Sequence, residues 1–112
     1  MSELEDTIGQ LQLQNQQLQT VLIQKQTLLI QSKEIEKALE EIEKSEDDIY
    51  KSVGPILIKT TKADIKKELE ESKEETDVKL KSLELHEKRI KTNIKGNQEK
   101  IQKLVPKSSQ GG

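Results

Sequence analysis

Few side chains of this 112-residue chain could do chemistry, and none has the neighbours that a reaction needs. The single histidine, His86, has no second histidine or carboxylate at a spacing that suggests a zinc site. Carboxylates cluster in residues 40–48, but no loop there has the spacing of a calcium site. There is no cysteine, no hydroxyl has a base to activate it, and no glycine-rich phosphate loop occurs. We therefore predict no enzyme activity, no cofactor and no metal site.

The composition points the same way. Of the residues, 30% are hydrophobic, 36% are charged and 1% are aromatic, whereas a typical soluble domain is about 45–50% apolar and about 25% charged. So few large apolar side chains cannot pack a thick core or line a substrate pocket. An elongated helical protein, a disordered chain and a subunit completed by partners remain possible. The abundance of Glu, Lys, Leu and Gln at helical spacing favours a coiled coil over disorder.

Charge is distributed unevenly along the chain. Residues 32–49 carry eight acidic and three basic side chains, whereas residues 50–112 carry fifteen basic and ten acidic ones. This indicates either segments that lie against each other or a neighbour, or solvated faces with an incidental imbalance. Because the basic residues alternate with acidic ones, we predict no nucleic-acid binding. No apolar run approaches the roughly 18 residues of a membrane span, and the acidic N-terminus is unlike a signal peptide, so we expect a cytoplasmic protein without membrane contact.

Residues 4–46 have the apolar periodicity of one long helix. A stripe with spacings of three and four runs along its first part: Ile8, Leu11, Asn15, Leu18, Leu22, Lys25 and Leu29. The stripe then slips by one position, as a straight helix does against a 3.5-residue repeat. It continues at Leu28, Ile35, Leu39, Ile42 and Ile49.

Residues 61–105 show a second helical pattern of nearly equal length. Thr61 is the predicted N-cap, with Asp64 three residues later in a capping-box arrangement. The apolar stripe consists of Leu69, Leu80, Leu83, Ile90, Ile94, Ile101 and Leu104, with Thr76, Glu87 and Asn97 in its gaps. Pro106 is predicted to end the helix, and the polar segment 106–112 to be a disordered tail.

Between the helices, residues 47–60 have a different character. β-branched residues and the single aromatic residue, Tyr50, concentrate on both sides of Gly54 and Pro55, which predicts two short strands joined by a turn. A lone two-stranded hairpin is marginal in water, and its two unpaired edges invite pairing with other chains. We therefore interpret the hairpin as an assembly element.

The hairpin would return the chain, so that the two helices pair as an antiparallel coiled coil. Two registers are possible, and one of them buries polar seam residues against apolar ones, at a cost of about 1–3 kcal/mol each. The preferred register instead matches these pairs: Leu22 with Ile90, Lys25 with Glu87, and Asn15 with Asn97. The predicted fold is mainly α: a long antiparallel two-helix coiled coil with one β-hairpin inserted between the helices.

Two stretches of the sequence resemble a prefoldin subunit. They are Leu18-Gln19-Thr20-Val21-Leu22 with Gln24-Lys25-Gln26, and Ile49-Tyr50-Lys51-Ser52-Val53-Gly54-Pro55-Ile56-Leu57-Ile58-Lys59. The resemblance is to the beta class, which has one hairpin where the alpha class has two, because residues 47–61 hold one hairpin only. It covers almost the whole chain, which we interpret as a single domain, 1–112. Pro55 and the tail after Pro106 depart from the family pattern.

The resemblance implies a molecular chaperone that works without ATP. It implies a hexamer of two alpha and four beta subunits, in which the hairpins join into a double β-barrel and the coiled coils project from it. It also implies that this hexamer, as a holdase, captures unfolded client proteins at the distal tips and delivers them to a group II chaperonin. Inside such a barrel Tyr50 is expected to pack against its neighbours.

Two sets of residues are the candidate sites. Subunit assembly is assigned to the hairpin residues Ile49, Tyr50, Val53, Gly54, Ile56, Leu57 and Ile58. Client contact at the distal tips is assigned to Leu4, Ile8, Leu11, Leu13, Ile101, Leu104 and Val105. For four of the second set the alternative is an ordinary seam position: Ile8, Leu11, Ile101 and Leu104. The alternative function for the whole chain is a structural coiled-coil scaffold or tether, which the heptads alone would support.

Overall fold

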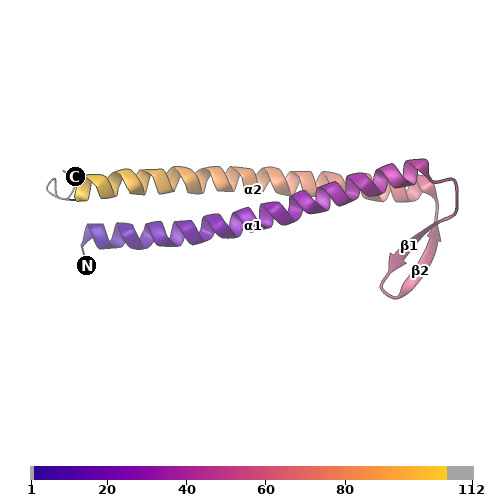
Figure 1. The fold of residues 1–112 in the computed structure, drawn as a ribbon, viewed down its shortest axis with the longest axis horizontal. Helices are drawn as coiled ribbons and strands as arrows, with labels where there is room; N and C mark the ends of the chain where they lie inside the picture. Colours follow the sequence, from indigo (N-terminus) through magenta and orange to yellow (C-terminus); the bar gives the residue numbers. More distant parts are fainter. Residues whose placement is uncertain (1, 106–112) are drawn as a thin grey trace. The chain divides into compact units, whose positions relative to one another are not determined.

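The structure, a computed structural model, describes residues 2–105. It contains helix α1 (Glu3–Lys44), strands β1 (Ile49–Val53) and β2 (Ile56–Thr60), and helix α2 (Lys62–Leu104), as Figure 1 shows. This order confirms the predicted fold of two long helices with one hairpin between them. The chain divides into two compact units. The terminal unit comprises Met1–Lys25 with Ser82–Gly112, and the hairpin unit comprises Gln26–Lys81.

Side-chain and backbone hydrogen bonds fix the ends of the helices. The hydroxyl oxygen of Thr61 accepts a hydrogen bond from the backbone N–H of Asp64 at 3.1 Å, which confirms the predicted N-cap of α2. Helix α1 ends at Lys44, two residues earlier than expected, because the N–H of Ser45 bonds to the carbonyl of Ile42 in a tighter closing turn. The predicted helix stop at Pro106 and the tail 106–112 lie outside the described residues.

The hairpin has a two-residue turn. Strand β1 pairs antiparallel with β2, and the register places Val53 opposite Ile56. Gly54 has a positive φ of 59°, whereas the ring of Pro55 holds its own φ near −65°. A positive φ followed by a negative one is the pattern of a type II′ turn, whose first central position favours glycine. The turn predicted at Gly54 and Pro55 is therefore confirmed.

A small apolar cluster forms the core of the terminal unit. Val21, Ile90 and Ile94 are exposed by only 3%, 4% and 8%. Three partly buried residues pack against this cluster: Leu11, Leu18 and Leu83. Two helices in contact can enclose only a narrow seam, so few residues are fully buried.

The first part of the predicted stripe of α1, from Ile8 to Leu29, was wrong by one residue at every second position, whereas its continuation at Leu28, Ile35, Leu39 and Ile42 is half-buried as predicted. Ile8 and Leu22 are 40% and 41% exposed, and the side chains at 15 and 29 are also exposed. The inward positions are Thr7, Gln14, Val21 and Leu28. With these, α1 has an unbroken seven-residue repeat from Leu4 to Ile42, so the predicted slip does not occur.

The cause of this error is that polar residues occupy the true seam. Thr7 is only 2% exposed, and its hydroxyl donates to the backbone carbonyl of Glu3 at 2.8 Å, so it can be buried without a partner on α2. The amide of Gln14 is a hydrogen-bond partner of Asn97. Because neither residue is apolar, the hydrophobic pattern favoured the neighbouring positions.

The stripe predicted for α2 is confirmed, and so is part of the register. Every position from Leu69 to Leu104 in that stripe is buried or half-buried. Lys25 contacts Glu87 at 3.1 Å between Nζ and Oε1, as predicted. The side-chain amide of Asn97 instead donates to Oε1 of Gln14 at 2.9 Å, so the expected pairing of Asn97 with Asn15 is wrong.

Within residues 2–105, neither helix is long and apolar enough to cross a membrane.

Candidate functional site

The hairpin presents two faces, which the strand register defines. Side chains alternate along a strand, and residues paired across the ladder share a face. The first face carries Ile49, Lys51, Val53, Ile56, Ile58 and Thr60. The second face carries Tyr50, Ser52, Leu57 and Lys59. Tyr50 therefore lies on the face opposite Val53 and Ile58.

Most apolar side chains of the hairpin are exposed. On the first face Val53, Ile56 and Ile58 are 48%, 60% and 47% exposed. On the second face Tyr50 and Leu57 are 56% and 69% exposed. The remaining apolar residue of the predicted assembly set, Ile49, is half-buried, and Gly54 forms the turn. The described part of the chain therefore leaves both faces of the hairpin largely uncovered.

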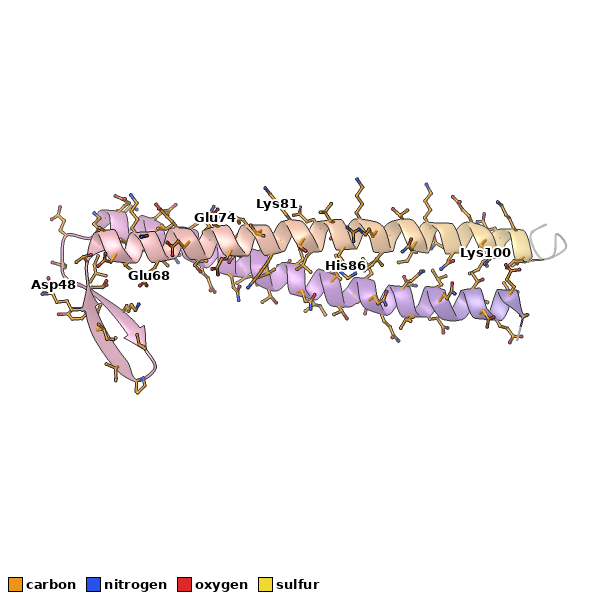
Figure 2. All side chains as sticks on the ribbon, turned by 180° about the vertical axis from the view of Figure 1, so that it is seen from behind. Asp48, Glu68, Glu74, Lys81, His86 and Lys100 are labelled. Carbon is orange, nitrogen blue, oxygen red and sulfur yellow. The ribbon has the colours of Figure 1, made fainter. Side chains whose placement is uncertain are left out.

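Two ion pairs lie at the base of the hairpin within the hairpin unit. Lys51 Nζ lies 2.9 Å from Oε1 of Glu68 on α2, and Lys59 Nζ lies 3.6 Å from Oδ2 of Asp48. Figure 2 labels Asp48 and Glu68 at this part of the chain.

In the described residues β1 and β2 form one two-stranded sheet, so each strand has an outer edge without a neighbouring strand. Such edges are templates for pairing with another chain.

The residues assigned to client contact fall into two groups. Ile8 and Leu13 are 40% and 56% exposed on α1. The other five are half-buried: Leu4, Leu11, Ile101, Leu104 and Val105. The seam alternative is therefore wrong for Ile8, whereas Leu11 packs against the apolar cluster as a seam residue does. All seven belong to the terminal unit.

A charged group interrupts the apolar seam of the terminal unit. Glu87 accepts hydrogen bonds from Lys91 at 2.8 Å and from Lys25 at 3.1 Å. The ammonium groups of Lys91 and Lys25 hold the pKa of the Glu87 carboxyl below its ordinary value of 4.5. The Glu87 side chain is 12% exposed, so it stays ionised at neutral pH because both oxygens have cationic partners.

Two acidic side chains of segment 32–49 pair with lysines of α2 in the hairpin unit. Oε1 of Glu43 lies 2.6 Å from Lys66 Nζ, and this contact lowers the pKa of Glu43 and raises that of Lys66. Glu36 lies 3.5 Å from Lys73. Single acidic and basic side chains thus pair in the hairpin unit, but residues 62–81 carry six basic and seven acidic side chains, so the basic excess of residues 50–112 does not lie in this part of α2.

The histidine and the carboxylates considered as metal ligands do not gather into a site in residues 2–105. His86 is exposed on α2 (Figure 2), and no group of three potential metal ligands occurs among the described side chains. Sequence reasoning did miss several exposed apolar residues on the helices, among them Ile23, Val78 and Leu85, which are 68%, 62% and 58% exposed. Their positions off the seven-residue seam are the signal that could have identified them.

The comparisons with known proteins agree with this arrangement. A family model described as "Prefoldin subunit" matches residues 5–108. The prefoldin subunit beta of Archaeoglobus fulgidus is 38% identical over 53 residues, a match that covers 47% of this chain and 46% of that protein. The crystal structure of the prefoldin beta subunit from Thermococcus strain KS-1 is similar with a TM-score of 0.88 and 36% identity, over 94% of each chain. Since the family match extends through both helices and the hairpin, this chain belongs to the prefoldin subunit family, and its likeness is to the beta subunits.

Proposed function

We propose that this chain is a beta-type subunit of a cytoplasmic chaperone hexamer with two alpha and four beta subunits. The hexamer would hold unfolded proteins without ATP and deliver them to a group II chaperonin. The observation that carries the proposal is the hairpin, whose apolar side chains and strand edges are left largely uncovered by residues 2–105.

The hairpin supports assembly for a physical reason. An isolated two-stranded hairpin is at best marginally stable in water, and three or more strands with a covered apolar face are needed for independent stability. Here five of its apolar side chains are about half exposed or more. Pairing with hairpins of other subunits would bury them, and closure of the strands into a barrel would remove the unpaired edges.

The helix ends support client binding. The terminal unit exposes Ile8 and Leu13, and Leu4 and Val105 are half-buried. Such scattered apolar side chains offer weak contacts to the apolar segments of an unfolded protein. Several weak contacts on separate arms of one hexamer act together through effective concentration, so that the total affinity exceeds that of each arm.

The first experiment tests assembly. The chain is mixed with an alpha-type subunit, and the native mass is measured for the wild type and for Val53→Asp/Ile58→Asp. Both substitutions place charges on the first face of the hairpin, so we expect the wild type to form a complex of about six chains and the variant to lose it. Helix content by circular dichroism should remain. The matched control is Val78→Asp/Leu85→Asp, which adds the same charges at apolar positions of α2 that are 62% and 58% exposed.

The second experiment tests client binding. Reduced lysozyme, denatured in guanidinium, is diluted into buffer without ATP, and light scattering is followed. The wild-type complex should suppress the scattering, and Ile8→Ser/Leu13→Ser should weaken this effect more than Val78→Ser/Leu85→Ser. A wild-type mixture that stays monomeric, or that scatters like lysozyme alone, would contradict the proposal. If the complex formed equally well with the charged hairpin, a scaffold held by its heptads would be the better interpretation.

A further inference from the structure

Two glycines occupy the interior of helices in the terminal unit without a packing reason. They are Gly9 in α1 and Gly96 in α2, and a Cβ added at either position would meet nothing within 4 Å. Among the described residues the one glycine with positive φ is Gly54, so the backbone does not require glycine at 9 or 96 either. Glycine in a helix interior is less favourable than alanine by a factor of about four to five. Both helices are therefore weakened in the same unit, with no local compensation.

The surrounding contacts are also weak. We define the end segments as residues 3–10 of α1 and 96–104 of α2. Their seam contains half-buried Leu4, Ile101 and Leu104 and the buried Thr7, whose hydroxyl bonds within its own helix to the carbonyl of Glu3. Their ion pair joins Glu3 to Lys100 at 3.1 Å, with side chains 62% and 47% exposed, and exposed pairs of this kind contribute little.

A polar contact lies at the inner end of the end segments, and their residue Asn97 takes part in it. Gln14 and Asn97 bond to each other across the seam at 2.9 Å. Beyond it lies the cluster of Val21, Ile90 and Ile94. Opening of the end segments would therefore leave that cluster intact, which is the condition for local unfolding at low cost.

Building on the proposed function, we infer that Gly9 and Gly96 determine client capture by keeping the end segments easy to open. In the closed state Ile8 is exposed, whereas Leu4, Ile101 and Leu104 are half-buried. Opening releases these three side chains to an unfolded chain. The apparent affinity for a client that binds only the open state is reduced in proportion to the fraction of molecules that are open. The two glycines raise this fraction and therefore raise the apparent affinity.

The test compares the assembled wild type with Gly9→Ala/Gly96→Ala. Amide hydrogen exchange in the end segments should slow by about fourfold for each glycine and about 20-fold if the two segments open together. Exchange near Val21 and Ile90 should not change. The matched control is Thr20→Ala/Thr92→Ala, which also improves the helix propensity of the same two helices. Both threonines are exposed and lie outside the end segments.

The second measurement is the affinity for denatured, reduced lysozyme. We expect the glycine variant to bind it several-fold and at most about 20-fold more weakly than the wild type, in proportion to the slowed exchange. The control should bind as the wild type does. Unchanged exchange in the end segments would overturn the inference, and so would slowed exchange with unchanged affinity. A wild type that captures no lysozyme would instead refute the proposed function. In that case the hydrogen-exchange measurement would still show whether the glycines keep the end segments easy to open.

Discussion

Replacing Ile90 and Ile23 separately by alanine tests the position of the seam. The two residues are chemically identical and belong to the same unit, but Ile90 is 4% exposed and Ile23 is 68% exposed. An Ile→Ala change removes three carbon atoms, each contributing about 0.8 kcal/mol when fully buried. Scaled by exposure, the loss is about 2.3 kcal/mol at 90 and about 0.8 kcal/mol at 23.

Helix propensity corrects both values equally. Alanine is a better helix former than isoleucine by about 0.4 kcal/mol. The net destabilisation is then about 2 kcal/mol for Ile90→Ala and about 0.4 kcal/mol for Ile23→Ala. Truncation of an enclosed side chain also leaves a cavity, which lowers the stability further. Val21 and Ile94 pack with Ile90, so the destabilisation by Ile90→Ala can rise to about 3 kcal/mol.

The assay is urea unfolding followed by circular dichroism at one fixed protein concentration, since assembly shifts the apparent stability. Both variants should keep the slope of the wild type, so that the change in midpoint reports the change in free energy. Costs that agree within about 0.5 kcal/mol would refute the reasoning, because burial is the one property in which the two sites are meant to differ.

Three further predictions follow from local contacts. Gly54→Ala should destabilise the hairpin by about 1–2 kcal/mol, because φ is 59° there, and the mass of the complex should become more sensitive to dilution. Thr61→Ala should lower the thermal midpoint through loss of about 1 kcal/mol of capping, whereas Thr61→Ser should restore it. The folded-state pKa of Glu87 is depressed by Lys91 and Lys25, so its stabilisation is present above pH 4.5 and is lost as the pH falls through the lower folded value. In unfolding measurements from pH 7 to 3, Glu87→Gln should remove that part of the pH dependence.

The parts of the fold with a strong local signal were predictable from the sequence. The turn at Gly54 and Pro55, the N-cap at Thr61 and the stripe of α2 each depend on a few neighbouring residues, and all are observed. The contact between Lys25 and Glu87 was also predictable, because two opposite charges at seam positions satisfy each other.

The register of α1 was not predictable from apolar periodicity. Its true seam includes Thr7 and Gln14, whose burial depends on hydrogen bonds to the carbonyl of Glu3 and to Asn97. A pattern of hydrophobic residues cannot report such bonds, and the exposed Ile8 and Leu22 formed a more apolar stripe. The exposure of the side chains in the candidate site was not predictable from the sequence either. The sequence indicated the hairpin as an assembly element, but the exposure of its side chains depends on what the helices leave uncovered.

Side chains of the hairpin alternate between its two faces, and this alternation restricts how the hairpin can enter the proposed barrel. Tyr50 and Val53 lie on opposite faces, so in one regular closed barrel only one of them can point inward. The first face has four apolar residues among its six, whereas the second has two among its four and also carries Ser52 and Lys59. A barrel interior favours the more apolar face, because burial of Lys59 would cost more than burial of Val53 gains. Lys51 is the charged residue on the first face. Its ammonium group pairs with Glu68 on α2 at 2.9 Å, so this charge can lie at the edge of the barrel and outside its apolar interior. In the proposed assembly we therefore expect Val53 and Ile58 inside and Tyr50 on the outer surface, which differs from the expectation based on the family resemblance that Tyr50 packs inside the barrel.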